Sequence, residues 1–223
     1  IAFLTADVAY TIMAGFEGGV SNFVANLDGA GAVTHPTQLQ ALQARAILMN
    51  QSAPPGQRKL VMNPDTGAVM VSTLTGLLNP APAISRQYME GTMYDALGFR
   101  WFEDQTTINH TSGTYTAGTV NGAGQTGTSV VSSATAGTLN QGDFITLASV
   151  NQVNRITKAT AGVLRQFAVT APVPAGSTSI PIYPAIIPAV GGVAQQYQTV
   201  TVSPANGAAI LLVTIASSTY SKN

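Results

Sequence analysis

A run of 56 residues, 166–221, contains no Asp, Glu, Lys or Arg. A run of this length raises the question of a membrane segment. However, Pro, Gly, Ser and Thr interrupt it throughout, and a spanning helix needs about 20 predominantly apolar residues in succession. The run is therefore predicted to form short β-strands joined by turns rather than to cross a membrane.

Charge is scarce in the rest of the chain as well. Charged residues make up 8% of the 223 residues and hydrophobic residues 45%, whereas an average soluble protein is roughly 25% charged. A free monomer relies on surface charge for its solubility. A chain with so little charge must present Thr, Ser, Gln and Asn to water, or it must cover its surface with other subunits.

The few charges are unevenly distributed along the chain. Residues 1–104 carry five Lys or Arg and eight Asp or Glu, which gives −3, and residues 105–223 carry four and one, which gives +3. Opposite charge on two segments helps subunits to find their register. On this basis we expect Arg155, Lys158 and Arg165 to contact acidic patches on a neighbouring subunit. No basic cluster typical of nucleic-acid-binding proteins occurs.

The sequence predicts no catalytic, cofactor-binding or metal-binding residue. It contains no cysteine, which excludes disulfides, thiol catalysis and Cys-based zinc sites. His35 and His110 lack the spaced ligands of a metal site, and Ser and Thr are too common here for a Ser-His pairing to be informative. We expect both histidines to lie in turns or on the surface, and the chain not to be an enzyme.

The stretch "NGAGQTGTSV", residues 121–130, has the G-x-G-x-x-G spacing of dinucleotide-binding loops at Gly122, Gly124 and Gly127. A true fingerprint follows a buried strand and opens a helix. Here the following segment is rich in Thr, Ser and Val, which are poor helix formers. The glycines are therefore predicted to serve a long turn that needs positive φ angles, and no nucleotide site is expected.

Helix and strand signals mix in the first half. Residues 34–50 are predicted to form a helix that has a capping box at Thr37 and Gln40 and ends before Pro54. The apolar positions at spacings of three and four predict one buried stripe, made of Leu39, Leu42, Ala46 and Met49. Residues 58–67 are predicted to form a strand closed by a turn, and residues 83–98 a helix interrupted at Gly91.

Residues 99–105, "FRWFEDQ", alternate in a way that predicts a strand. Phe99 and Trp101 would share its core face, and Phe102 the other. Adjacent strand residues point to opposite faces. The neighbouring acids Glu103 and Asp104 are therefore expected to be ion-pair partners rather than a cooperating pair.

Several short strands are predicted after residue 160, and they indicate a small barrel or sandwich. In residues 165–173 Phe167 and Val169 alternate with polar or small residues and are predicted core positions. Residues 178–187, "TSIPIYPAII", are predicted to form an edge strand because proline cannot donate to a sheet. Residues 197–204 are the third predicted strand.

Three blocks of the sequence resemble the major coat protein family typified by the phage P22 coat protein. The first is residues 39–70, a helix, a P-x-G-x-R turn and a strand ending in Asn-Pro. The second is residues 76–116, which contain Arg86, Gly91, Gly98, Phe99, Trp101 and the "HTSG" that begins at His110. The third is residues 136–173, which resemble the insertion domain of that family.

The resemblance implies an α+β subunit of the HK97-type capsid fold, with peripheral and axial domains and an inserted small β-barrel. It implies residues 1–108 in the main fold without its N-terminal part, residues 109–210 in the barrel, and residues 211–223 as a return segment. The extended loop of the family and its covalent cross-link have no counterpart that can be placed in this sequence.

The function that the resemblance implies is that of a major capsid subunit. Hexamers and pentamers of such subunits form an icosahedral shell around double-stranded DNA, which they contact weakly and non-specifically. Scaffolding and portal proteins are the expected partners, the virion the expected location, and the host bacterial cytoplasm the place of assembly. The alternative is a β-rich module of a phage tail or spike that binds carbohydrate or a cell surface, to which the Thr/Gly-rich second half is also suited.

Overall fold

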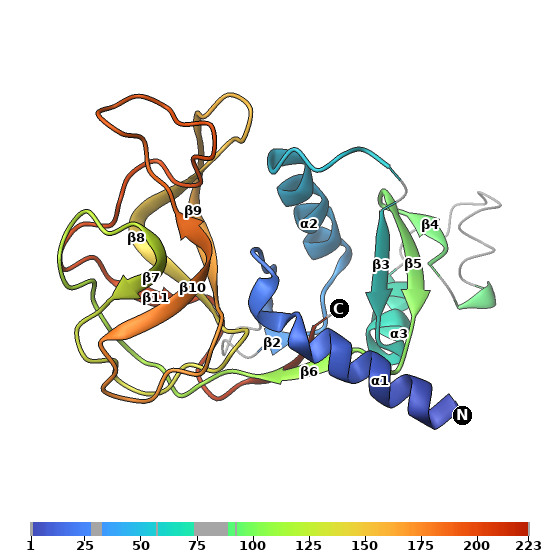
Figure 1. The fold of residues 1–223 in the computed structure, drawn as a ribbon. Helices are drawn as coiled ribbons and strands as arrows, with labels where there is room; N and C mark the ends of the chain where they lie inside the picture. Colours follow the sequence, from blue (N-terminus) through green and yellow to red (C-terminus); the bar gives the residue numbers. More distant parts are fainter. Residues whose placement is uncertain (1, 28–32, 57, 74–88, 92, 223) are drawn as a thin grey trace.

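The computed structural model describes residues 2–27, 33–56, 58–73, 89–91 and 93–222, and it arranges them in two lobes joined by a two-stranded ribbon (Figure 1). The helical lobe contains α1 (Ala2–Gly15), η1 (Glu17–Gly19), β1 (Asn26–Leu27), β2 (Val33–Thr34), α2 (Gln38–Asn50), β3 (Lys59–Met62), α3 (Pro64–Ser72), β4 (Asp95–Ala96) and β5 (Phe99–Glu103). The ribbon consists of β6 (Ile108–Thr111) and β12 (Thr219–Lys222). The β lobe contains β7 (Gly127–Val131), β8 (Phe144–Val153), β9 (Thr160–Val169), β10 (Ser179–Ile186) and β11 (Ile210–Leu212).

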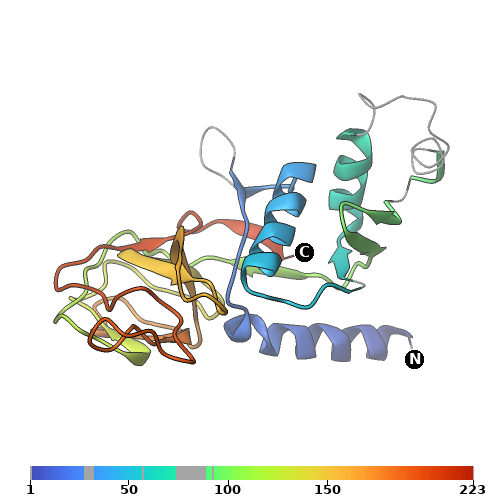
Figure 2. The same ribbon diagram turned by 90° about the horizontal axis from the view of Figure 1, so that it is seen from above.

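The helical lobe is built on a small mixed sheet in the order β3-β5-β4, in which β3 is parallel and β4 antiparallel to β5. α1 runs from the far end of this lobe to the junction with the β lobe (Figure 2). None of the helices in the described residues combines the length and apolar character that a membrane crossing requires. The core of the lobe consists of Ala41, Met62, Met70, Val71, Met93, Phe99 and Trp101.

The predicted helix of residues 34–50 is confirmed as α2, and so is its capping box. The backbone N–H of Thr37 donates to Oε1 of Gln40 (3.0 Å). The predicted buried stripe is wrong, because Leu39, Leu42 and Met49 are exposed and Ala41 is the buried position. Apolar residues occur on several faces of this helix, so their spacing does not select the face that packs.

The turn predicted after β3 is wrong, because α3 begins there. The side chain of Asn63 accepts a hydrogen bond from the backbone N–H of Thr66 (2.8 Å), and Pro64 occupies the first helical position. Asn at the N-cap followed by Pro is a strong helix start. Residues 83–88 and 92 of the helix predicted over residues 83–98 lie outside the described residues. Of the rest, residues 89–90 are helical and residues 95–96 form the strand β4.

The alternation predicted for residues 99–105 is confirmed in β5. Phe99 and Trp101 are buried while Phe102 is exposed, and the two buried rings make an edge-to-face contact at 6.4 Å. Trp101 Nε1 also donates to the carbonyl of residue 96 (2.9 Å). The ion pairs expected for Glu103 and Asp104 are not formed within the described part of the chain. Asp104 instead accepts a hydrogen bond from the backbone N–H of Thr106 (2.8 Å).

The β lobe is a five-stranded antiparallel sheet in the order β11-β8-β9-β10-β7. Residues 118–121 connect its two outer strands. The N–H of Ile210 in β11 donates to the carbonyl of Gly118 (3.0 Å), and the N–H of Asn121 donates to the carbonyl of Val131 in β7 (2.9 Å). The core inside this sheet includes Phe167 and Val169, both 0% exposed.

Two strand predictions for the second half need correction. The strand over residues 178–187 was expected at an edge, but β10 lies between β9 and β7. It tolerates its prolines because it pairs with β9 only at Ile182 and Tyr183, and its register with β7 shifts after Pro181. Residues 197–204 form no named strand; only Val200 makes an isolated bridge, with Gln152.

The glycine-rich stretch is a turn, as predicted. Gly122, Gly124 and Gly127 all have positive φ angles, and the strand β7, not a helix, follows them. The side chain of Gln125 organises the turn, because it donates to the carbonyl and accepts from the N–H of Val131 (2.9 and 2.7 Å). The N-terminal end of a helix, which a dinucleotide phosphate would require, is not present at this loop.

Gly113 provides a direct test of the packing where the chain enters the β lobe. A Cβ atom at Gly113 would lie 2.1 Å from the carbonyl oxygen of Thr138, whereas one at Gly56 would meet nothing within 4 Å. We expect Gly113→Ala to lower the free energy of unfolding by about 1–3 kcal/mol or more, and Gly56→Ala to change it by about 0.5 kcal/mol at most. Denaturant unfolding measures both, and equal effects would contradict the close approach.

Candidate functional site at the junction of the lobes

The chain enters and leaves the β lobe through two paired strands. β6 and β12 are antiparallel, with Thr111 opposite Thr219 and Ile108 opposite Lys222, and the N–H of Ser112 extends the ladder by donating to the carbonyl of residue 218 (2.9 Å). The expected boundary between residues 210 and 211 passes through β11, all three residues of which pair with β8. The return to the helical lobe therefore begins at β12.

The carboxylate of Asp143 lies at the centre of the junction. It is 0% exposed and immediately precedes β8. One of its oxygens is 2.8 Å from Nε2 of His110, and the other accepts the backbone N–H groups of Gly113 (3.0 Å) and Asn140 (2.7 Å). Because a buried charge is costly unless it is paired and hydrogen-bonded, this set of contacts fixes β6 against the start of β8.

His110 lies between two carboxylates. Its Nδ1 is 3.5 Å from Oε2 of Glu17 on the side opposite Asp143. Burial lowers the pKa of His110, but hydrogen bonds to Asp143 and Glu17 outweigh this and raise the pKa above its ordinary value. The expectation of a turn or surface histidine is wrong for His110, which is 3% exposed, whereas His35 is exposed and its Nδ1 is 3.2 Å from the hydroxyl of Thr66.

Lys222 and Glu17 extend the cluster to the helical lobe. Lys222 Nζ lies 3.5 Å from Oε1 of Glu17 and donates to the carbonyl of Gly142 (2.9 Å). Burial raises the pKa of Glu17, but His110 and Lys222 outweigh it and the pKa is lowered. Burial lowers the pKa of Lys222, and Glu17 offsets part of that effect. The cluster thus alternates in sign, from Asp143 through His110 and Glu17 to Lys222.

A strap formed by residues 17–24 crosses the junction beside this cluster. Phe23 stacks on Phe144 at 5.0 Å between ring centroids and contacts Tyr220 at 5.2 Å. The side-chain amide of Gln166 accepts the N–H of Phe23 (2.6 Å) and donates to its carbonyl (3.0 Å). Two hydrogen bonds from one side chain of β9 therefore hold the strap to the β lobe.

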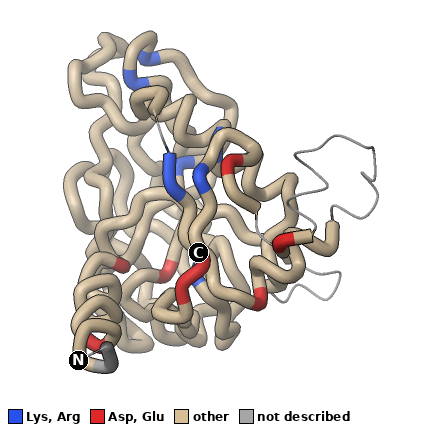
Figure 3. The backbone as a smooth tube through the Cα atoms, turned by 90° about the vertical axis from the view of Figure 1, so that its right-hand side faces the viewer, with Lys and Arg blue, Asp and Glu red and all other residues tan. Residues whose placement is uncertain are grey.

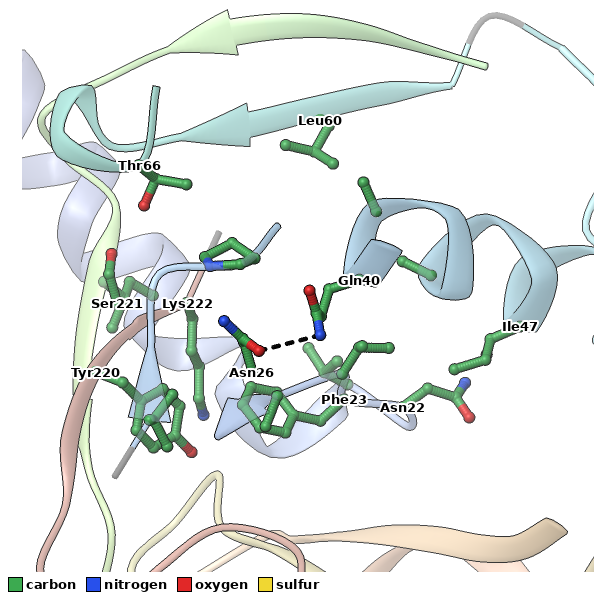
Figure 4. A pocket seen from close by; sticks show the side chains of 18 of the residues that line it. Asn22, Phe23, Asn26, Gln40, Ile47, Leu60, Thr66, Tyr220, Ser221 and Lys222 are labelled. Carbon is green, nitrogen blue, oxygen red and sulfur yellow. Dashed lines mark hydrogen bonds between the residues drawn. The ribbon is translucent and has the colours of Figure 1, made fainter. Parts of the chain in front are cut away.

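A cavity of about 660 Å³ lies between the strap, α2 and β12 (Figure 4). Its wall is mostly apolar, and its polar groups bond within the wall. Nε2 of Gln40 donates to Oδ1 of Asn26 (3.1 Å), and Nδ2 of Asn26 donates to the carbonyl of His35 (2.9 Å). The side-chain amides of Gln40 and Asn26 are therefore already bonded within the protein.

The junction is built to hold two lobes together rather than to catalyse a reaction. Both ring nitrogens of His110 face carboxylates, which leaves neither to activate a nucleophile. The nearby hydroxyl of Ser112 bonds to Thr214 (3.2 Å) and to the carbonyl of residue 218. Within the described residues, no group of three or more His, Cys, Asp or Glu side chains has an arrangement that could hold a metal ion.

The cations expected at a subunit interface lie far from this junction, at the outer end of the β8–β9 hairpin. Arg155 is exposed there, and Lys158 is half-buried and donates to the carbonyl of Gln196 (2.6 Å). Arg165 is not on the surface as expected, because it is only 2% exposed. It shares a strand face with Phe167 and Val169 and therefore points inward.

The sequence did not reveal Asp143, Glu17, Lys222 and Gln166 as parts of one site. One signal was available. Asp143 is the only acid after Asp104, and a lone acid in an apolar segment is often paired when it is buried. Its partners come from positions far apart in the chain, so their proximity depends on the tertiary fold.

The family comparison concerns most of the β lobe and the outgoing strand of the ribbon, β12. Residues 124–223 match the family model described as P22 coat protein, gene protein 5. The expected resemblance to this family of phage coat proteins is thereby confirmed. The solved structure of the CUS-3 coat protein I-domain is 26% identical over 45% of this chain and 96% of that chain, with a TM-score of 0.35. A search of curated proteins finds no match.

His110 makes the stability of the junction depend on pH. Its pKa in the fold is raised above 6.5, so the stabilisation by protonated His110 is complete below pH 6.5 and is lost as the pH rises through the raised pKa. We expect the free energy of unfolding to fall across this window in the unmodified chain and not in His110→Asn. Denaturant titrations at a series of pH values measure it. The control His35→Asn keeps the fall; a fall that persists in His110→Asn would contradict the assignment.

Proposed function

We propose that the chain is a structural subunit of a phage capsid and that its β lobe is a domain inserted into the main coat fold. The observation that carries this proposal is the family match over residues 124–223, which covers β7 to β12. The paired ribbon supports the insertion, because the chain leaves the β lobe beside the strand by which it entered. On this basis residues 112–218 form the inserted domain, and β6 and β12 form its stem.

The inserted domain is proposed to be a small barrel. Residues 118–121 hydrogen-bond to β11 at one edge and to the end of β7 at the other, which is the contact that closure of a sheet requires. Closure removes the exposed sheet edges that would otherwise pair with other chains. The remaining elements, α1 to β5, are proposed to be parts of an HK97-type main fold.

The surface of the helical lobe supports a role in assembly. α1 and the residue that follows it present apolar side chains at a spacing of four residues. Leu4, Val8, Ile12 and Phe16 are each at least 50% exposed. Contiguous exposed apolar surface usually marks an interaction site, and large permanent interfaces are more apolar than transient ones. This surface suits a subunit that is covered by neighbours in a shell.

The shell is proposed to be icosahedral, made of hexamers and pentamers, and to enclose double-stranded DNA. Scaffolding and portal proteins would take part in its assembly in the host bacterial cytoplasm. Outside the four-residue cluster at the junction, the β lobe carries few charges, so contact with DNA would be weak and non-specific. Strong binding would need many neutralised phosphates.

Electron microscopy of the complete gene product, expressed with its scaffolding protein, tests this proposal. Closed shells of uniform size are the expected result. A protein that stays monomeric with its scaffold present, and that binds glycans on an array, would contradict the capsid role and favour a surface-binding module. Deletion of residues 112–218 is a second test of the insertion. If these residues are a domain inserted on a paired stem, their removal leaves two cut ends that already lie side by side.

A further inference from the structure

The outer end of the β lobe carries a distinct surface, here called the tip surface. It consists of Arg155, Ile156 and Lys158 in the β8–β9 turn, Val163 in β9, and Tyr197 in the loop that follows β10. The bond from Lys158 Nζ to the carbonyl of Gln196 (2.6 Å) holds the turn against that loop. The two segments therefore form one continuous surface.

The tip surface is apolar and exposed. Ile156 is 77% exposed, Tyr197 75% and Val163 54%. Leu164 is also exposed, so this half of β9 is uncovered on both of its faces. Within the part of the chain that the structure describes, β10 pairs with β9 only at Ala168 and Val169, so this half of β9 has no strand partner on that side. An exposed apolar strand with an unpaired edge is a typical docking element.

The charges at the tip are all of one sign. Arg155 is exposed, whereas Arg165 is buried and its Nε has no hydrogen-bond partner among the described residues. Burial, together with the nearby Arg155, lowers the pKa of Arg165 to about 10. The only acid in residues 112–218 is Asp143, which is buried and already bonded at the junction. With Lys158, the tip therefore has three cations and no unpaired carboxylate of its own lobe to balance them.

The matching carboxylates lie on the other lobe. Figure 3 shows most Asp and Glu in the lower part of the view and most Lys and Arg above them, both at the tip and on the helical lobe. Exposed acids of the helical lobe are Asp7, Asp65, Glu90, Asp95, Glu103 and Asp104. Because the tip and these acids lie at different ends of the molecule, the tip of one copy can meet them only on another copy.

We propose that the tip surface binds exposed carboxylates of the helical lobe on a second copy of this chain. The inference rests on the proposed function and adds the surface and the chemistry of its partner. The two faces differ, so the contact is heterologous and joins copies head to tail. Such contacts form rings when the rotation between copies closes, and rings are the geometry that hexamers and pentamers need.

Charge reversal in the full chain tests the contact. The variant Arg155→Glu/Lys158→Glu should weaken self-association at least tenfold in sedimentation velocity. Added salt should weaken the self-association of the unmodified chain. The matched control Lys59→Glu/Arg100→Glu makes the same change in net charge on the helical lobe, where both cations are exposed. It should associate at least as well as the unmodified chain. Circular dichroism and thermal unfolding of each variant check that it folds.

A zero-length carbodiimide cross-link identifies the partner surface. In a mixture of ¹⁴N- and ¹⁵N-labelled chains, Lys158 should form mixed-isotope links to carboxylates of the helical lobe. If the unmodified chain associates but the tip variant associates equally well, or Lys158 links only within one copy, the inference is wrong and the capsid proposal stands. If the unmodified chain never associates even with its scaffolding protein present, both the inference and the capsid proposal are wrong. Normal association with reduced retention of duplex DNA would assign the tip to DNA and overturn the inference.

Discussion

The buried carboxylate of Asp143 is the interaction on which the arrangement of this molecule depends. It has no access to water, so its charge must be balanced within the protein. His110 supplies a charged partner from the incoming strand of the ribbon, and backbone N–H groups of Gly113 and Asn140 supply two further donors. Through these contacts one side chain fixes where the ribbon ends and where the long β8–β9 hairpin begins.

The same cluster couples the β lobe to the helical lobe. Glu17 reaches His110 from the strap, and Lys222 reaches Glu17 from the outgoing strand. Beside them Phe23 packs on Phe144, and Gln166 bonds to the backbone of Phe23. A paired stem alone would leave the β lobe free to swing. The strap and the cluster add contacts on a second side, so the lobe is held at two points.

A chain with so few charges uses them in two ways. One group is buried at the junction, where hydrogen bonds compensate the loss of solvent. The other remains on the outside, as cations at the tip and as a mixture of carboxylates and cations on the helical lobe (Figure 3). The apolar stripe of α1 and the exposed side chains at the tip follow the same logic. Both are tolerable on a subunit whose surface is covered by neighbours.

Local signals in the sequence predicted local structure well. The capping box of α2, the alternation in β5 and the turn at Gly122–Gly127 were all readable, because each depends on residues close together in the chain. The face of α2 that packs could not be predicted, because the helix is apolar on several sides and the tertiary contacts decide which side is buried. The central position of β10 could not be predicted either, because it depends on which strands pair around its prolines. The junction was missed because Glu17, His110, Asp143 and Lys222 meet only in the folded chain.

The most direct measurement of the central claim is a double-mutant cycle between His110→Gln and Asp143→Asn. Hydrogen bonds to charged groups contribute about 1.5–3 kcal/mol, and independent sites add within about 0.5 kcal/mol. If this pair holds the junction, denaturant unfolding at pH 6 should give a coupling energy of about 1.5 kcal/mol or more. Additive effects within about 0.5 kcal/mol would contradict the account and show that the lobes are held by the strap and the ribbon alone.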